Sequence, residues 1–178
     1  MTAPALLGPA AGPVRLAAGA GFVAVLTLLS VIDLRTRRLP DPVVLPALWA
    51  GLLLNAGCSL FAAPPDAVLG AAAGYGALWL LSAAYGPRSR AGAAFGGGDL
   101  KLAAMIGAWL GVEAMPAALL VAFTSGTLAV LPGLVRGRLR LGQAVPFGPA
   151  LALGGAAALA AGPSLAGWLA PWPAMGAR

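Results

Sequence analysis

Long apolar stretches recur along the chain and are separated by short polar or Gly/Pro-rich connections. A helix needs about 20 apolar residues to cross the hydrocarbon core of a bilayer. We therefore expect an all-α polytopic membrane protein, folded as one transmembrane domain over residues 1–178. The pattern predicts about six membrane-spanning helices, at approximately residues 16–34, 43–60, 67–85, 99–112, 116–135 and 147–169. The fourth of these is short for a full crossing.

The connections contain residues that start helices. In Leu39-Pro40-Asp41-Pro42 the prolines disfavour helix at the preceding residue and suit a first helical turn. Asp41 is predicted to cap the second helix, and Asp66 to cap the third. The abundance of glycine, 26 residues in all, predicts close packing of the helices through small side chains.

Composition supports a membrane protein and restricts its chemistry. The chain is 60% hydrophobic and 9% charged, whereas soluble domains carry roughly 25% charged residues. It has no histidine, so imidazole catalysis is excluded. Its one cysteine, Cys58, forms no internal disulfide or Cys-based zinc site and is expected to be a small core residue. We expect neither a metal ion nor a cofactor.

Basic residues predict the orientation of the helices. With six crossings, the first, third and fifth connections face one side of the membrane, and the second and fourth connections lack basic residues. By the positive-inside rule the basic side is cytoplasmic and both termini lie on the other side. The net charge of +6 is then explained by the orientation of the helices and by contact of the arginines with lipid head groups. We expect no nucleic-acid partner. The residues on the basic side are Arg35, Arg37, Arg38, Arg88, Arg90, Lys101, Arg136, Arg138 and Arg140.

Two of the five acidic residues occur at the ends of apolar spans. Asp33 ends the first span and Asp99 begins the fourth, so the topology places both at the cytoplasmic face. Carboxylates at a membrane boundary are costly, which makes them functional candidates. Two neighbouring carboxylates share a proton, so one can take a proton from water while the other donates to a scissile carbonyl. This is the acid–base division of aspartic proteases.

Residues around these aspartates are candidates for shaping the site. The run Gly96, Gly97 and Gly98 tolerates positive φ and close backbone approach, which suits a passing substrate strand. Taken alone, this run with Asp99 fits a plain loop followed by a helix cap as well as it fits a catalytic site. Lys101 lies one turn from Asp99 and is expected to extend toward the head groups, with tuning of Asp99 as the alternative.

The segment Pro146-Phe147-Gly148-Pro149 begins the sixth span on the same face. It either shapes the substrate path or simply starts the helix. Both readings place Pro146, Phe147 and Gly148 at the membrane face that carries the two aspartates.

Several motifs together resemble the type IV prepilin peptidases. They cover residues 26–161 in order and with compatible gaps. They are Ile32-Asp33, Leu39-Pro40-Asp41, Leu45-Pro46-Ala47-Leu48-Trp49-Ala50-Gly51-Leu52-Leu53-Leu54-Asn55, Gly96-Gly97-Gly98-Asp99-Leu100-Lys101-Leu102, Gly107-Ala108-Trp109-Leu110-Gly111 and Val145-Pro146-Phe147-Gly148-Pro149.

The resemblance implies a membrane aspartyl protease with a GxGD signature, whose catalytic residues match Asp33 and Asp99. Such enzymes remove the basic leader of prepilins and pseudopilins at the cytoplasmic face of the plasma (inner) membrane, in pilus biogenesis and protein secretion. Many members also carry an N-terminal domain with paired cysteines and methylate the new N-terminus. With about fifteen residues before the first span and one cysteine, this chain resembles the short peptidase-only form, and we expect no methyltransferase activity.

Two other functions fit the same residues. The carboxylates could bind protons or sodium in an ion-coupled transporter, although both lie at one face instead of near the midplane. The chain could also be an inactive membrane scaffold that keeps the fold alone.

Overall fold

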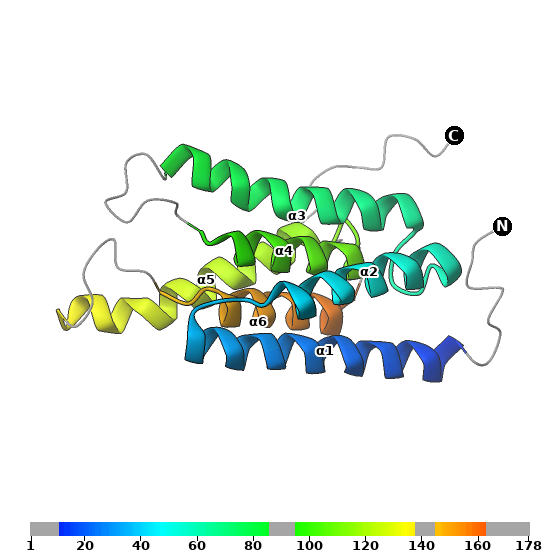
Figure 1. Ribbon diagram of the computed structural model, residues 1–178, viewed down its shortest axis with the longest axis horizontal. Helices are drawn as coiled ribbons and strands as arrows, with labels where there is room; N and C mark the ends of the chain where they lie inside the picture. The colour runs from blue at the N-terminus through cyan, green and yellow to red at the C-terminus, as the bar shows by residue number, and fades with distance from the viewer. Residues whose placement is uncertain (1–10, 86–94, 138–144, 163–178) are drawn as a thin grey trace.

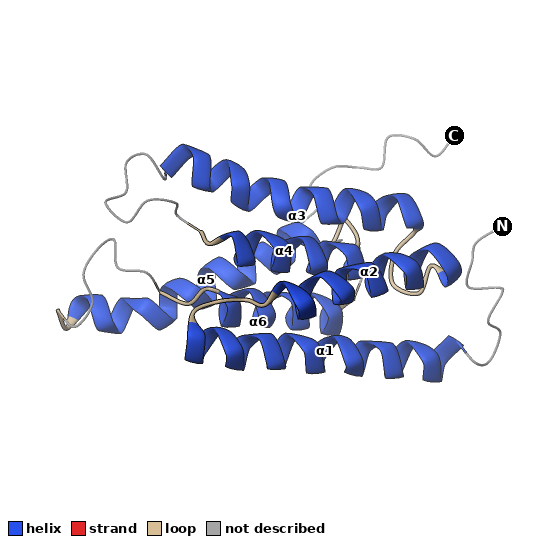
Figure 2. Ribbon diagram, viewed as in Figure 1, coloured by secondary structure: helices blue, strands red, loops and turns tan. Residues whose placement is uncertain are grey.

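The structure is a computed structural model that describes residues 11–85, 95–137 and 145–162. Over these ranges the chain forms six α-helices and no strand (Figures 1 and 2). The helices are α1 (Ala11–Thr36), α2 (Asp41–Cys58), α3 (Pro64–Tyr85), α4 (Gly97–Leu110), α5 (Met115–Val135) and α6 (Gly148–Ala161). Successive helices run in alternating directions (Figure 1). The ends of α1, α3 and α5 therefore lie at the same end of the bundle as the starts of α2, α4 and α6.

The all-α prediction is confirmed. Nearly every predicted boundary agrees with the structure to within a few residues; α1 begins five residues earlier than expected. Residues 163–169 of the sixth predicted span lie outside the described ranges. The number of membrane crossings, the side of the termini and the single-domain assignment stay predictions.

Four of the helices are long and apolar enough to cross a membrane: α1, α2, α3 and α5. Large apolar side chains point outward from them, such as Leu80, Leu128 and Val135, each more than 60% exposed. Such a surface suits lipid and would be unusual on a soluble monomer. The chain is a multi-pass membrane protein.

Helix α4 occupies the centre of the bundle and packs against α2, α3 and α6. Its Leu102, Met105 and Ile106 side chains are fully buried. At a rise of about 1.5 Å per residue, its 14 residues span roughly 21 Å, less than the roughly 30 Å of the hydrocarbon core. Because protein covers this helix on most sides, its length need not match the lipid.

Glycines bring α3 and α4 into backbone contact. A Cβ atom on Gly107 would collide with the carbonyl of Gly70, and one on Gly74 would lie 2.7 Å from the carbonyl carbon of Ala103. On the other side of the bundle, Gly154 of α6 packs in the same way on the Ala118 carbonyl of α5. The prediction of close packing through small residues is confirmed at these contacts.

A buried asparagine fixes the end of α4 opposite the aspartates. Asn55 is fully buried; its Nδ2 donates to the carbonyls of Ala108 (2.9 Å) and Trp109 (3.0 Å). Its Oδ1 accepts from the backbone N–H groups of Phe61 (3.0 Å) and Ala62 (3.1 Å). This one amide therefore connects α2, the turn before α3 and the C-terminal end of α4.

Replacing Asn55 by leucine is expected to lower the free energy of unfolding by about 2 kcal/mol or more, because two buried and two partly buried backbone groups lose this partner. The measurement is the thermal unfolding midpoint in detergent. Thr27→Ala is the control, since Thr27 is exposed and bonds only to Val23 of its own helix. Equal midpoints for the two variants would contradict this role of Asn55.

The predicted caps of α2 and α3 are wrong. Pro40 is the N-cap of α2 and Asp41 its first residue, with no side-chain capping bond. Helix α3 begins at Pro64, so Asp66 lies within its first turn. The prolines supply the helical φ at both starts, and the carboxylates still gain from the positive end of the helix dipole. Cys58, expected in the core, is a free and only partly buried cysteine at the end of α2.

Candidate active site

Asp33 is a buried carboxylate near the end of α1. It is only 5% exposed, and its Oδ2 accepts a hydrogen bond of 2.9 Å from the backbone N–H of Gly148. Gly148 is the first residue of α6, so the carboxylate lies at the positive end of that helix dipole. A buried charge needs such partners. The start of α6 therefore holds Asp33 in place.

Only glycine fits at position 148. A Cβ atom there would lie 2.6 Å from Oδ2 of Asp33 and 3.0 Å from its Cγ. Pro149 follows at a first-turn position, where a missing N–H costs nothing. The Pro-Phe-Gly-Pro segment thus starts α6, as one of the two readings predicted, and it also positions the Asp33 carboxylate. Its part in a substrate path stays a prediction.

Asp99 lies in the first turn of α4 and is partly buried. Its Oδ2 accepts a hydrogen bond of 3.1 Å from the N–H of Gly96, as in a capping box. The carboxylates of Asp33 and Asp99 are close enough to interact electrostatically. Helices far apart in sequence therefore bring the two acids together at one end of the bundle. In the described part of the chain, no group of three or more Asp, Glu or Cys side chains is placed to hold a metal ion.

The glycine run before Asp99 does not adopt positive φ, so that expectation is wrong. Gly96 is extended, with φ −70° and ψ 152°, which is ordinary N-cap geometry. Close approach does occur at Gly98, where a Cβ atom would lie 2.8 Å from Cβ of Leu39. The neighbour is thus the connection between α1 and α2. At Gly97 nothing lies within 4 Å of a Cβ position.

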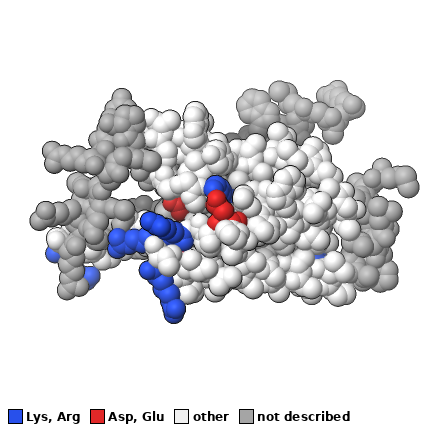
Figure 3. Space-filling view, viewed as in Figure 1, with Lys and Arg blue, Asp and Glu red and all other residues white. Residues whose placement is uncertain are grey.

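Lys101 contacts Asp41 and not Asp99. Its Nζ lies 2.7 Å from both carboxylate oxygens of Asp41, and both side chains are substantially exposed. Figure 3 shows basic and acidic atoms in contact on the face in view. This ion pair joins α4 to the start of α2 beside the candidate site. No local sequence pattern predicts this pair, because the partners are 60 positions apart.

Comparison with known proteins assigns the family. The model of the type IV leader peptidase family matches residues 20–131, more than half of the chain. The chain belongs to the type IV leader peptidase family. The resemblance found in the motifs is confirmed.

Curated relatives of this chain are named prepilin leader peptidase/N-methyltransferase. One from Burkholderia pseudomallei is 44% identical over 155 residues, which is 87% of this chain and 48% of the relative. One from Dickeya chrysanthemi is 45% identical over 141 residues, 79% of this chain and 48% of the relative. One from Neisseria gonorrhoeae is 40% identical over 134 residues, which is 75% of this chain and 45% of the relative.

The chain thus spans about half the length of the curated relatives it matches. No solved structure matches it. The absence of methyltransferase activity stays a prediction.

Basic residues of this leader peptidase family member gather at the end of the bundle that carries the aspartates (Figure 3). Arg35 ends α1, and the backbone N–H of Arg37 donates to the Asp33 carbonyl at 2.8 Å. Arg38 follows, and Arg136 caps the end of α5. Arg88, Arg90, Arg138 and Arg140 lie outside the described ranges. The shared location of arginines and aspartates agrees with the sequence-based topology.

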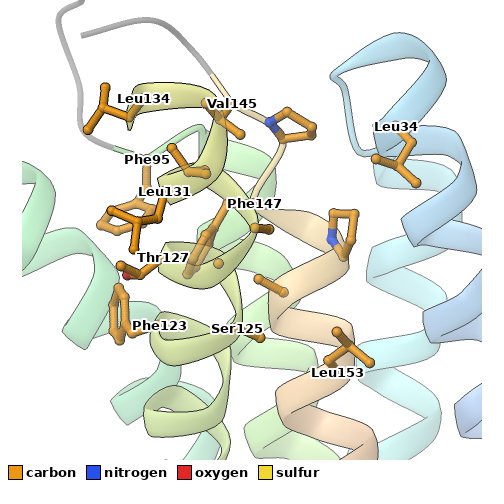
Figure 4. Close-up of a pocket in the computed structure, with 16 residues that line it drawn as sticks. Leu34, Phe95, Phe123, Ser125, Thr127, Leu131, Leu134, Val145, Phe147 and Leu153 are labelled. Atoms are coloured by element: carbon orange, nitrogen blue, oxygen red, sulfur yellow. The ribbon is translucent and has the colours of Figure 1, made fainter. Parts of the chain in front are cut away.

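An apolar groove of about 530 Å³ adjoins the aspartates, between α5 and α6 (Figure 4). Phe95, Phe123 and Phe147 cluster at its wall, with ring centroids 5.1 to 5.9 Å apart. We name it the α5–α6 groove. Its lining residues are Leu34, Phe95, Phe123, Ser125, Gly126, Thr127, Ala129, Val130, Leu131, Leu134, Val145, Pro146, Phe147, Pro149, Ala150 and Leu153.

Pro146 and Phe147 were predicted to shape a substrate path, and both line this groove. Sequence reasoning missed Phe95 and Phe123, although Phe95 directly precedes the glycine run. It also gave Asn55 no role, although an amide inside an apolar span is a signal for a buried hydrogen-bonding group.

Proposed function

We propose that this chain is an aspartic endopeptidase that removes the leader peptide of type IV prepilins or pseudopilins, with Asp33 and Asp99 as its catalytic pair. The observation that carries the proposal is that two carboxylates, from α1 and α4, lie at the same end of a membrane bundle, near enough for their charges to interact. The names of the relatives supply the substrate class.

The two carboxylates divide the chemistry between them. The ionised carboxylate takes a proton from a water molecule, and the oxygen of that water attacks the scissile carbonyl carbon. The protonated member donates its proton to the carbonyl oxygen, which gives a tetrahedral diol. Collapse of the diol breaks the C–N bond: the carboxylic acid formed from the first base gives its proton to the leaving amine, and the other carboxylate takes a proton from one diol hydroxyl. The pair thus returns to its starting protonation state. The N–H groups of Gly148 and Gly96 each hold one carboxylate oxygen during these steps.

In this proposal the active site lies at the cytoplasmic face of the plasma membrane. Arg35, Arg37, Arg38 and Arg136 lie at the same end of the bundle as the aspartates, and basic residues favour the cytoplasmic side. A substrate whose basic leader remains in the cytoplasm would present its cleavage site at this level.

The test is cleavage of a type IV prepilin precursor by the purified chain in lipid vesicles. We expect two fragments whose masses sum to that of the precursor plus one water. An intact precursor, together with proton or sodium flux that requires Asp33, would overturn the proposal in favour of an ion-coupled transporter.

A further inference from the structure

The α5–α6 groove is continuous with the residues that hold the two aspartates. Leu34 follows Asp33 on α1, and Phe147 and Pro149 flank Gly148, the hydrogen-bond donor to Asp33. Phe95 precedes Gly96, the donor to Asp99. The groove is therefore lined by residues that directly adjoin Asp33 and the two backbone donors in sequence, although neither aspartate lines it.

The lining of the groove selects an apolar occupant. Among the lining residues that the structure describes, Ser125 and Thr127 have polar side chains and none has a charged one. The Ser125 hydroxyl already donates to the Ala122 carbonyl of its own helix at 3.2 Å. The volume of about 530 Å³ lies in the range of about 300–1,000 Å³ that encloses ligands in proteins.

The groove is open toward the lipid. Leu131 on α5 is 47% exposed, and Leu153 on α6 is 58% exposed. Figure 4 shows Leu131 on α5 beside the phenylalanine cluster and Leu153 on α6, away from that cluster. An apolar segment that enters sideways from the bilayer would therefore meet exposed leucines at this side of the groove.

We propose that the α5–α6 groove binds an apolar segment of the substrate polypeptide next to the scissile bond. This inference rests on the proposed function, since it names the part of the substrate that this site recognises. A lipid acyl chain shares the same apolar chemistry. The position of the groove favours the polypeptide, because Leu34, Phe95 and Phe147 adjoin the residues that hold the two acids. A peptide bond must reach those acids, and the residues next to it in the substrate must then lie close by.

The kinetic test fills the groove with a larger side chain. Ala129→Trp, on the lining of α5, is expected to lower kcat/KM for a type IV prepilin precursor by about tenfold or more, mainly through KM. Leu128→Trp is the matched control, since Leu128 is the neighbouring residue, is exposed and does not line the groove. It is expected to cleave at the wild-type rate. Wild-type kcat/KM in Ala129→Trp would overturn the inference.

A binding test separates this inference from the proposed function. A photoreactive amino acid at position 129, in an Asp99→Asn background, is expected to cross-link to the same precursor, whereas one at position 128 is not. Cross-links to lipid alone would overturn the groove assignment and leave the peptidase proposal intact. Failure of the wild-type chain to cleave would overturn the peptidase proposal, whatever the cross-links show.

Discussion

Asparagine in place of either Asp33 or Asp99 is expected to lower the rate of leader removal by about 10³-fold or more. Positioned acid–base groups contribute about 10²–10⁴-fold each, and asparagine neither takes nor donates the required proton. The amide oxygen can still accept from Gly148 or Gly96, so the fold should be retained. The measurement is the initial rate of precursor cleavage in vesicles that contain equal amounts of inserted protein.

Glu113→Gln is the matched control for these variants. Glu113 is exposed and lies between α4 and α5, at the end of the bundle away from the aspartates. We expect it to cleave at the wild-type rate. Thermal midpoints close to wild type for both asparagine variants would show that the lost activity is not lost folding. A wild-type rate in Asp33→Asn would exclude that carboxylate from the reaction.

Alanine at position 148 is expected to slow cleavage by about 10²-fold. Its methyl group would lie 2.6 Å from Oδ2 of Asp33, so the carboxylate must move away from its position beside Asp99. A misplacement of about 1 Å in a catalytic constellation can cost about 10²-fold in rate. The measurement is kcat for the same precursor, with the thermal midpoint recorded in parallel.

Gly76→Ala provides the comparison, because nothing lies within 4 Å of a Cβ position at Gly76 on α3. It is expected to leave kcat unchanged. If Gly148→Ala also cleaved at the wild-type kcat, the contact between the start of α6 and Asp33 would have no part in positioning the carboxylate.

The helices and the meeting of Asp33 and Asp99 could be predicted because their signals are local. Apolar length marks each span, and arginines at alternate connections indicate direction. Once direction is known, the end of the first span and the start of the fourth must share one end of the bundle. The family motifs pointed to the same two residues. These inferences need no knowledge of side-chain packing.

The supporting contacts could not be predicted, because they depend on how the helices pack. The N–H of Gly148 on Asp33 and the ion pair of Lys101 with Asp41 join residues far apart in sequence. The glycine at 98 was expected to accommodate a substrate, but it accommodates Leu39. The role of Asn55 could have been predicted, because a side-chain amide inside an apolar helix needs hydrogen-bond partners and backbone groups at helix ends are the usual ones.

The most direct test of the paired aspartates compares the double variant Asp33→Asn/Asp99→Asn with the two single variants, in the same vesicles and with the same precursor. If the carboxylates share one proton and one reaction, removing the second costs little more than removing the first. We therefore predict that all three residual rates agree within about threefold. If the fold-loss in rate of the double variant instead equalled the product of the two single fold-losses, the two aspartates would act independently. That result would contradict a single catalytic pair.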